Sequence, residues 1–364
     1  MTVPDPSPQP AQAVFRGVRA HTVVEHIDAL TQPHRLAEHG FWVVVGQFEG
    51  RVDAWRLEHV ERSSTDDAVV TRPWNGPPAS AWRSSLTREA YLNGVEAIRR
   101  DIRDGEVYQV NLCRVLEAPL AADHPGPDAE ALAAVLARAN PAPHASRIVI
   151  PSTSQMPGTW VVSASPELYL RVRGDLVESA PIKGTVAPGE QMLEKDRAEN
   201  VMITDLIRND LSHVARPGSV QVPELLGLHE HPGLVHLQST VSAQLAPEFA
   251  WTGSMWAHLL AGTFPPGSVS GAPKEAALRI IAREETVRRG PYCGAIGWID
   301  ADRHCAELAV GIRTFWWDDA DGGTVRFGTG AGITWGSDPQ GEWEETQLKA
   351  SRLIALASTE TMAP

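Results

Sequence analysis

Short runs of apolar residues, bounded by turn-forming residues, recur along most of the chain. Their β-branched and aromatic content predicts antiparallel strands at 41–48, 147–151, 159–165, 168–173, 293–300, 306–317 and 323–335. Between them, apolar residues spaced three and four apart predict helices over 87–104, 128–139, 190–211, 251–261, 273–288 and 341–357. Because the strands come in runs without a strict βαβ alternation, the sequence predicts an α+β fold, with layered antiparallel β-sheets and helices packed outside.

The pattern shows no internal repeat and no linker long enough to separate two folding units. We expect residues 1–86 to form an N-terminal subregion packed on the same fold, and residues 87–364 to form the main domain. The first dozen residues are rich in proline and are expected to be disordered. The polar segment 58–86 is expected to be a surface excursion. One compact domain is therefore the expected overall organisation.

Charge and composition narrow the class of protein. A net charge of -13 over 364 residues argues against a nucleic-acid surface and, more weakly, against an anionic membrane. No apolar stretch reaches the length of a membrane span, and the N-terminus lacks the pattern of a signal peptide. Cys113, Cys293 and Cys305 form no paired spacing, which is typical of free thiols. We therefore expect a soluble cytoplasmic protein that binds neither nucleic acid nor membrane.

Two pairs of acidic residues share one spacing. Asp196 and Glu199 lie three residues apart in one predicted helix, and Glu342 and Glu345 repeat this spacing at the start of the last helix. If the two helices face each other, four carboxylates converge, and such an all-oxygen set suits Mg²⁺. From spacing alone, two solvated helix faces are the more common explanation.

Basic residues in apolar surroundings suggest an anionic ligand. Lys183 lies between Ile182 and Gly184, which favours a side chain pointing into a pocket, and Arg313 lies in an otherwise apolar strand. The "GTGAG" stretch at 328–332 leaves backbone N–H groups free to bind a carboxylate. Taken one at a time, these features are also explained by turns and packing.

Two further stretches resemble known motifs but fail on detail. The segment 262–274 resembles a phosphate-binding loop, yet it ends in Gly-Ala-Pro-Lys and lacks the Gly-Lys-Ser/Thr sequence. His229, His231 and His236 suggest zinc, but their spacing matches neither HExxH nor a Cys/His ligand set, and no cysteine is near. His236 is the one we place at a candidate site or in the core.

Taken together, the motifs resemble those of the chorismate-utilising enzymes. The matching stretches are "YQVNL" (108–112), "SASPE" (163–167), "PIKGT" (181–185), "AEN" and "DLIRNDL" (198–211), "HLQS" (236–239), "GSVSGAPK" (267–274), "GPYCGAIG" (290–297), "IRT" (312–314), "GAGI" (330–333) and "SDPQGEWEET" (337–346). The resemblance covers about residues 85–357. It implies a single α+β domain with a magnesium-dependent site for chorismate, a small dicarboxylate with a ring hydroxyl.

The resemblance also implies roles for individual residues. Glu199 and Glu345 would hold Mg²⁺ directly, with Asp196 and Glu342 assisting. The residues expected to bind the substrate are Gln109, Thr185, Tyr292, Arg313, the backbone of Gly330 and Gly332, and Lys349.

Two positions favour one branch of the family. Isochorismate and salicylate synthases carry a lysine base where this chain has Gln109, and anthranilate synthases have alanine where it has Lys183. "PIKGT" resembles component I of aminodeoxychorismate synthases, which implies that Lys183 is a nucleophile. Glu167 is then the expected acid, with His236 at the site.

The implied reaction converts chorismate and ammonia to 4-amino-4-deoxychorismate, for p-aminobenzoate and folate synthesis. The ammonia would come from a separate glutamine amidotransferase subunit. The alternatives are component I of anthranilate synthase, an isochorismate or salicylate synthase, and a non-catalytic binding subunit.

Overall fold

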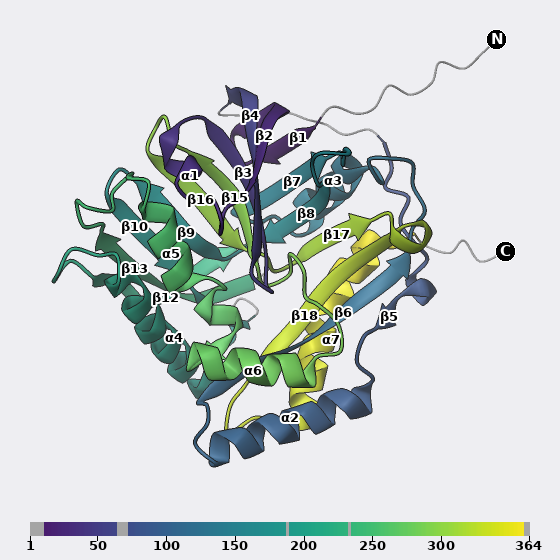
Figure 1. The fold of residues 1–364 in the computed structure, drawn as a ribbon. Helices are drawn as coiled ribbons and strands as arrows, with labels where there is room; N and C mark the ends of the chain where they lie inside the picture. Colours follow the sequence, from purple (N-terminus) through teal and green to yellow (C-terminus); the bar gives the residue numbers. More distant parts are fainter. Residues whose placement is uncertain (1–10, 64–71, 187–188, 232–233, 360–364) are drawn as a thin grey trace, which may run out of the picture.

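The strands of the computed structural model form one continuous antiparallel sheet that bends into two layers (Figure 1). The structure describes residues 11–63, 72–186, 189–231 and 234–359. In order of pairing, the first layer contains β6 (Gln109–Pro119), β18 (Thr324–Ile333), β17 (Thr314–Asp318), β8 (Thr159–Ser165), β7 (His144–Ile150), β1 (Gln12–Phe15) and β2 (Val18–Asp28). Short β5 (Arg83–Ser84) and β14 (Gly271–Ala272) pair with β6.

The second layer continues from β2 without a break in the pairing. Its order is β4 (Arg51–Arg62), β3 (Phe41–Gln47), β15 (Ala295–Asp300), β16 (Cys305–Val310), β9 (Leu168–Arg173), β10 (Leu176–Ala180) and β13 (Leu234–Gln244). β12 (Gln221–His231) and β11 (Ile182–Val186) also pair with β13. The N-terminal strands therefore connect the two layers, because β1 pairs with β7 and β3 pairs with β15.

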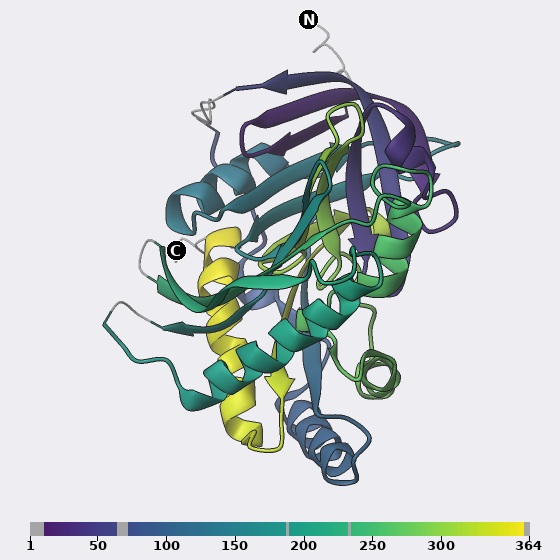
Figure 2. The ribbon, with the colours of Figure 1, turned by 90° about the vertical axis from the view of Figure 1, so that its left-hand side faces the viewer.

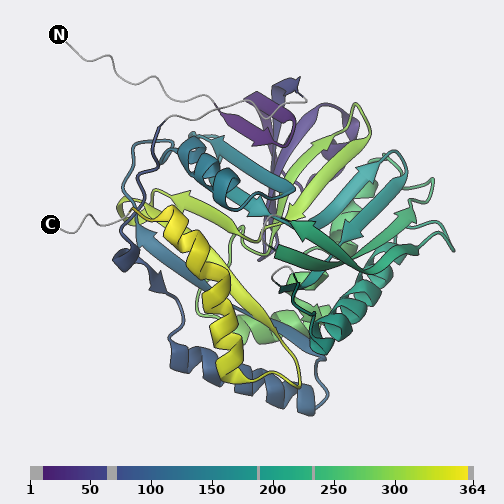
Figure 3. The ribbon, with the colours of Figure 1, turned by 180° about the vertical axis from the view of Figure 1, so that it is seen from behind.

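Helices cover the outer faces of the sheet (Figures 2 and 3). They are α1 (Arg35–Glu38), α2 (Arg88–Arg103), α3 (Ala129–Ala139), α4 (Glu194–Ser212), α5 (Met255–Thr263), α6 (Lys274–Glu284) and α7 (Pro339–Ala357), with 3₁₀ turns η1 (Ala79–Ala81), η2 (Gly267–Val269) and η3 (Ala320–Gly322). α7 packs on β18 and α2, α4 packs on β13 and β11, and α6 packs on β6. None of the helices described is long and apolar enough to cross a membrane.

Local signals explain where the two acidic helices begin and what they cover. The side chain of Asp338 accepts a hydrogen bond from the N–H of Gly341, and Pro339 follows at the first helical position of α7. α4 buries Ile203, Ile207 and Leu211 against the sheet and so leaves its first turns to present polar groups.

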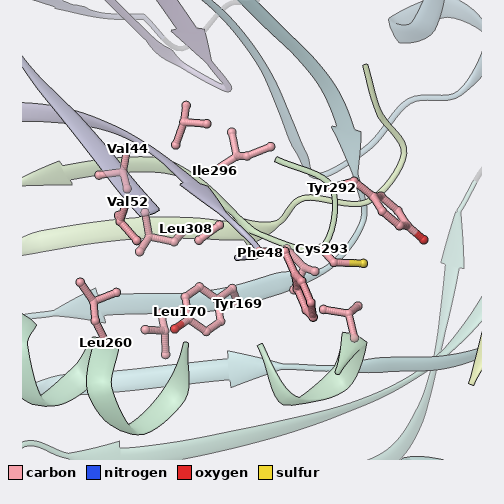
Figure 4. Packing of buried hydrophobic residues seen from close by; sticks show 14 of the residues in the cluster. Val44, Phe48, Val52, Tyr169, Leu170, Leu260, Tyr292, Cys293, Ile296 and Leu308 are labelled. Atoms are coloured by element: carbon pink, nitrogen blue, oxygen red, sulfur yellow. The ribbon is translucent and has the colours of Figure 1, made fainter. Parts of the chain in front are cut away.

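The main core consists of apolar side chains from strands of both layers and from helices packed on them. Figure 4 shows Val44, Val52, Leu170 and Leu308 packed together with Leu260 of α5. The same cluster extends to Tyr292 and Cys293, which come directly before β15. A rigid core therefore reaches one side of the candidate site.

The α+β prediction is confirmed, but several strand predictions need correction. The run predicted at 306–317 is two strands, because residues 311–313 leave the sheet and Arg313 has a φ of 52°. Residues 58–62 belong to β4 rather than to a surface excursion. Of the Pro-rich start, residues 1–10 lie outside the described part, and β1 begins at Gln12.

Candidate active site

Lys183 lies within β11, at a bulge in the pairing of that strand with β13. The register of β11 against β13 shifts between Ile182 and Thr185, so Lys183 and Gly184 fall within a β-bulge, a feature that re-aims side chains. Gly184 has a φ of 83°, and a Cβ there would lie 2.8 Å from the Cβ of Asp196. The amine of half-buried Lys183 donates a hydrogen bond to the backbone carbonyl of Ser268, with the two atoms 2.9 Å apart.

Glu167 is a buried carboxyl group close to this amine. It lies between β8 and β9 and is only 3 % exposed. Burial raises the pKa of Glu167 to about 7, although a hydrogen bond from the Ser268 hydroxyl and the positive charges of Lys183 and Lys349 oppose that rise. Near neutral pH this group is therefore close to half protonated and able to donate or accept a proton.

The four acidic residues lie on the two helices, as the spacing predicts. Burial raises the pKa values of Glu199 and Asp196 on α4 and of Glu342 on α7. The pKa of Glu345 is lowered despite burial, because the amine of Lys349 lies 2.6 Å from its carboxylate. The pKa of Glu199 also responds to the charge of Glu345, so carboxylates from both helices share one region.

Lys195 is a cation of this region that the sequence motifs did not single out. Its Nζ lies 4.0 Å from Oε1 of Glu342 and 3.9 Å from Oε2 of Glu345. Burial lowers the pKa of Lys195, but the surrounding carboxylates outweigh this effect and raise it overall. Lysines 195 and 349 thus supply the positive charge next to the acidic residues.

The acidic set fits Mg²⁺ in its chemistry, since it offers hard carboxylate oxygens from two helices whose charges affect one another. Among the described residues, however, no three His, Cys, Asp or Glu side chains are gathered as a metal-binding group. Direct ligation by Glu199 and Glu345, with assistance from Asp196 and Glu342, stays a prediction.

The glycines of β18 bring the backbone close to the buried polar residues. A Cβ on Gly332 would lie 2.3 Å from Nε2 of Gln109 and 3.5 Å from Oε2 of Glu199. The side chain of Gln109 is buried, and its Oε1 has no hydrogen-bond partner among the described residues. This buried acceptor near Gly332 is a candidate partner for a hydrogen-bond donor of a ligand.

Gly330 lies on β18, and the ring of Tyr292 packs against the same strand at Gly328. The carbonyl of Gly330 accepts a hydrogen bond of 3.1 Å from Lys349, and a Cβ there would lie 2.4 Å from the Sγ of Cys113. The ring of Tyr292 covers Gly328, and its hydroxyl lies 3.8 Å from the same sulfur. Only glycine at positions 328 and 330 leaves room for this packing.

Arg313 is an unpaired cation beside Glu167. Its side chain is half-buried, and within the described residues no carboxylate lies within ion-pair distance of its guanidinium group. Burial lowers the pKa of Arg313, and the charge of Glu167 opposes this effect. An arginine held in this way is suited to binding an external carboxylate.

The histidines and Thr185 lie on the strands around Lys183. His236 is buried on β13, and its backbone is in register with Thr185 of β11 and His229 of β12. The ring of His229 hydrogen-bonds to Glu224 at 2.8 Å. The side chains of Thr185 and His231 lie outside the described part of the structure.

The stretch that resembles a phosphate loop has a structural role instead. Residues 267–269 form η2, and Gly271 and Ala272 form β14 beside Gln109. Lys274 starts α6 and pairs with Asp210 of α4 at 2.9 Å, with both side chains largely buried. This ion pair fixes α6 against α4.

We expect Lys274→Met to destabilise the protein by about 3 kcal/mol, because Asp210 would keep a buried charge without a partner. Urea unfolding followed by circular dichroism measures the change. The matched control is Arg279→Ala on the same helix, which removes an exposed ion pair with Glu275 and should hardly move the midpoint. Equal midpoints for the two variants would contradict this role of Lys274.

Ser268 and Lys195 are the two residues in this region that reasoning from the sequence missed. Ser268 contacts both Lys183 and Glu167. The "GSVSGAPK" motif contained the only signal for Ser268, and nothing in the motif says which of its residues faces Glu167.

Comparison with known proteins places the chain in a family. A family model described as chorismate binding enzyme matches residues 20–355. Anthranilate synthase component 1 1 of Haloarcula marismortui is 35% identical over 316 residues, covering 82% of this chain and 59% of that protein. Aminodeoxychorismate synthase component 1 of Klebsiella aerogenes is 36% identical over 289 residues, covering 76% of this chain and 59% of that protein. The chain thus spans about three fifths of the length of these relatives.

Solved structures share the fold. Anthranilate synthase component I of Streptococcus pneumoniae has a TM-score of 0.72 at 21% identity, covering 97% of this chain and 93% of that one. The menaquinone-specific isochorismate synthase of Escherichia coli has a TM-score of 0.74 at 19% identity, covering 96% of this chain and 89% of that one. The match to the family model and the identity to the relatives together show that the chain belongs to the chorismate binding enzymes.

Proposed function

We propose that this chain is the chorismate-converting component of an aminodeoxychorismate synthase, and that Lys183 is its nucleophile. The observation that carries the proposal is the position of the Lys183 amine, re-aimed by a bulge and hydrogen-bonded at 2.9 Å to the residue whose hydroxyl contacts Glu167. An amine and an acid of suitable pKa in one partly closed site are the groups that a covalent substitution requires.

The reaction takes place in two substitutions. In the first, the Lys183 amine forms a bond to C2 of chorismate, the ring double bonds shift, and the C4–oxygen bond breaks. Glu167 gives its proton to the departing hydroxyl, which leaves as water. In the second, ammonia forms a bond to C4, the C2–nitrogen bond breaks, and Lys183 is released as the product forms. Glu167 takes the proton that ammonia loses, so the site returns to its starting state.

The same geometry supports binding of both carboxylates of the substrate. The side chains of Arg313 and Tyr292, with the backbone of Gly330 and Gly332, are proposed to hold the enolpyruvyl carboxylate. Glu199 and Glu345 are proposed to hold Mg²⁺, with Asp196 and Glu342 assisting. When bound, the ion would supply positive charge for the ring carboxylate. The orphaned Oε1 of Gln109 is available to a donor on the ligand.

The source of ammonia is proposed to be a separate glutamine amidotransferase subunit, in the cytoplasm, with the product used for p-aminobenzoate and folate. The second candidate is component I of an anthranilate synthase, which the identity to the Haloarcula marismortui protein favours. Lys183 argues for the first candidate, because formation of anthranilate needs no amine from the protein.

The test is incubation of the purified protein with chorismate, Mg²⁺ and ammonium chloride, followed by chromatography of the products. The proposal expects 4-amino-4-deoxychorismate that keeps its enolpyruvyl group. Release of pyruvate with anthranilate would establish the second candidate instead. Intact-protein mass spectrometry without ammonia should show an adduct with the mass of chorismate minus one water.

We expect Arg313→Gln to raise the KM for chorismate by roughly 10- to 100-fold, because a hydrogen-bonded ion pair with a substrate carboxylate is lost. Steady-state kinetics at saturating ammonia measures this. Arg303→Gln is the control, since Arg303 is mostly exposed and lies beside Asp300. An unchanged KM in Arg313→Gln would place the enolpyruvyl carboxylate elsewhere.

A further inference from the structure

The short turn η2 contacts two groups of the proposed reaction through one residue. The backbone carbonyl of Ser268 accepts the hydrogen bond from Lys183 at 2.9 Å, and its hydroxyl donates to the carboxyl group of Glu167. These contacts come from segments far apart in sequence, because Glu167 precedes β9, Lys183 is in β11 and Ser268 follows α5. Ser268 itself is buried, at 6 % exposure.

The turn is held rigidly from three sides. The backbone carbonyl of Ser270 accepts a hydrogen bond from the N–H of Asn111 at 2.8 Å, and Arg289 donates to the carbonyl of Val269 at 2.9 Å. Gly267 packs so closely on α4 that a Cβ there would lie 2.7 Å from Leu206. A turn fixed by β6, α4 and Arg289 can set the positions of the groups that it contacts.

We propose that Ser268 is a positioning residue, whose carbonyl places the Lys183 amine and whose hydroxyl places the Glu167 carboxyl group on the same side of the substrate. This inference rests on the proposed function. It assigns the motif serine a role in the relative placement of nucleophile and acid, which must meet the C2 and C4 positions of one ring at the same time.

The hydroxyl has a second consequence that a merely structural residue would lack. Because it donates to the ionised form of Glu167, it lowers the pKa of that group. The other charged groups facing Glu167 are Lys183 of β11, Lys349 of α7 and Arg313 between β16 and β17, and Asp210 of α4 lines the same cavity. All of them stay in place when only the Ser268 hydroxyl is removed.

The experiment measures formation of the Lys183 adduct from chorismate and Mg²⁺, by quenching and intact-protein mass spectrometry over a range of pH. Ser268→Ala is expected to slow adduct formation by roughly tenfold or more. It should also move the alkaline limb of the pH–rate profile, where the rate falls as pH rises, to higher pH. The direction follows because Glu167 acts in its protonated form and its pKa rises when the hydrogen bond is lost. Ser268→Thr, which keeps a hydroxyl, should restore the position of the limb.

Ser270→Ala is the matched control. Ser270 is also buried in the same motif, but its hydroxyl donates to the carbonyl of Pro266 at 3.1 Å and makes no hydrogen bond to Glu167 or Lys183. The alkaline limb of its pH–rate profile should match that of the wild type. Thermal melting should show that all variants are folded. The inference is overturned if Ser268→Ala matches the wild type, or if both alanine variants slow the reaction equally with no shift of the limb.

Failure of the proposed function would look different. It is indicated by a wild-type protein that forms no lysine adduct while it still consumes chorismate. In that case the pH limb of chorismate consumption still tests whether Ser268 acts through Glu167.

Discussion

Lys183→Ala is expected to lower the rate of aminodeoxychorismate formation by about 10³-fold or more, because the attacking group of the proposed covalent route is lost. The adduct seen by intact-protein mass spectrometry should disappear altogether. Ammonia could still enter the space left by the side chain, so residual turnover is expected to place nitrogen at C2 of the ring. Product analysis by chromatography and nuclear magnetic resonance distinguishes the two isomers.

Removing Lys183 also removes a positive charge that lowers the pKa of Glu167. Lys183→Arg separates the two effects, because arginine keeps the charge but is not a nucleophile at neutral pH. We expect both variants to lack the adduct, with the alkaline limb shifted upward only in the alanine variant. Wild-type turnover in either variant would rule out the covalent route and leave direct addition of ammonia as the mechanism.

Part of the candidate site could be predicted from local sequence patterns. The three-residue spacing of Asp196 with Glu199 and of Glu342 with Glu345 predicted two acidic helices, and the structure has them as α4 and α7. Local periodicity was enough for this, because both residues of each pair lie on one helix. The carboxylates of the two helices influence each other only because the fold brings α4 and α7 close together. This packing is not encoded in any short segment of the sequence.

The parts that could not be predicted depend on long-range pairing. Arg313 was placed inside a single strand, yet the chain leaves the sheet at 311–313, and the departure with a φ of 52° puts the guanidinium near Glu167. β12 and β13 were missed because their histidines, glutamates and glutamines hide the apolar alternation. Ser268 reaches Glu167 only because η2 is packed between β6 and α4.

Glu167→Gln is expected to lower turnover by 10²- to 10⁴-fold, because an amide cannot give a proton to the departing hydroxyl. In the wild type the rate should fall as pH rises through about 7, where Glu167 loses its proton. The same variant should be more stable than the wild type at pH 8. The folded-state pKa lies above the ordinary value, so ionising Glu167 costs stability as pH rises from about 4.5 to 7, by roughly 3 kcal/mol in total.

Glu307→Gln is the control for this prediction, since it makes the same chemical change with the opposite effect on stability. Burial tends to raise the pKa of Glu307, but His144 and Arg171 outweigh it and lower the pKa to about 2. Its ionised form therefore stabilises the fold above pH 4.5, and this contribution is lost as pH falls toward 2. Glu307→Gln should unfold more easily than the wild type at pH 8, and the alkaline limb of its pH–rate profile should be unchanged. If Glu167→Gln instead lost stability at pH 8 and kept its turnover, Glu167 would be a structural anion rather than the acid, and the proton for the leaving hydroxyl would have to come from another group.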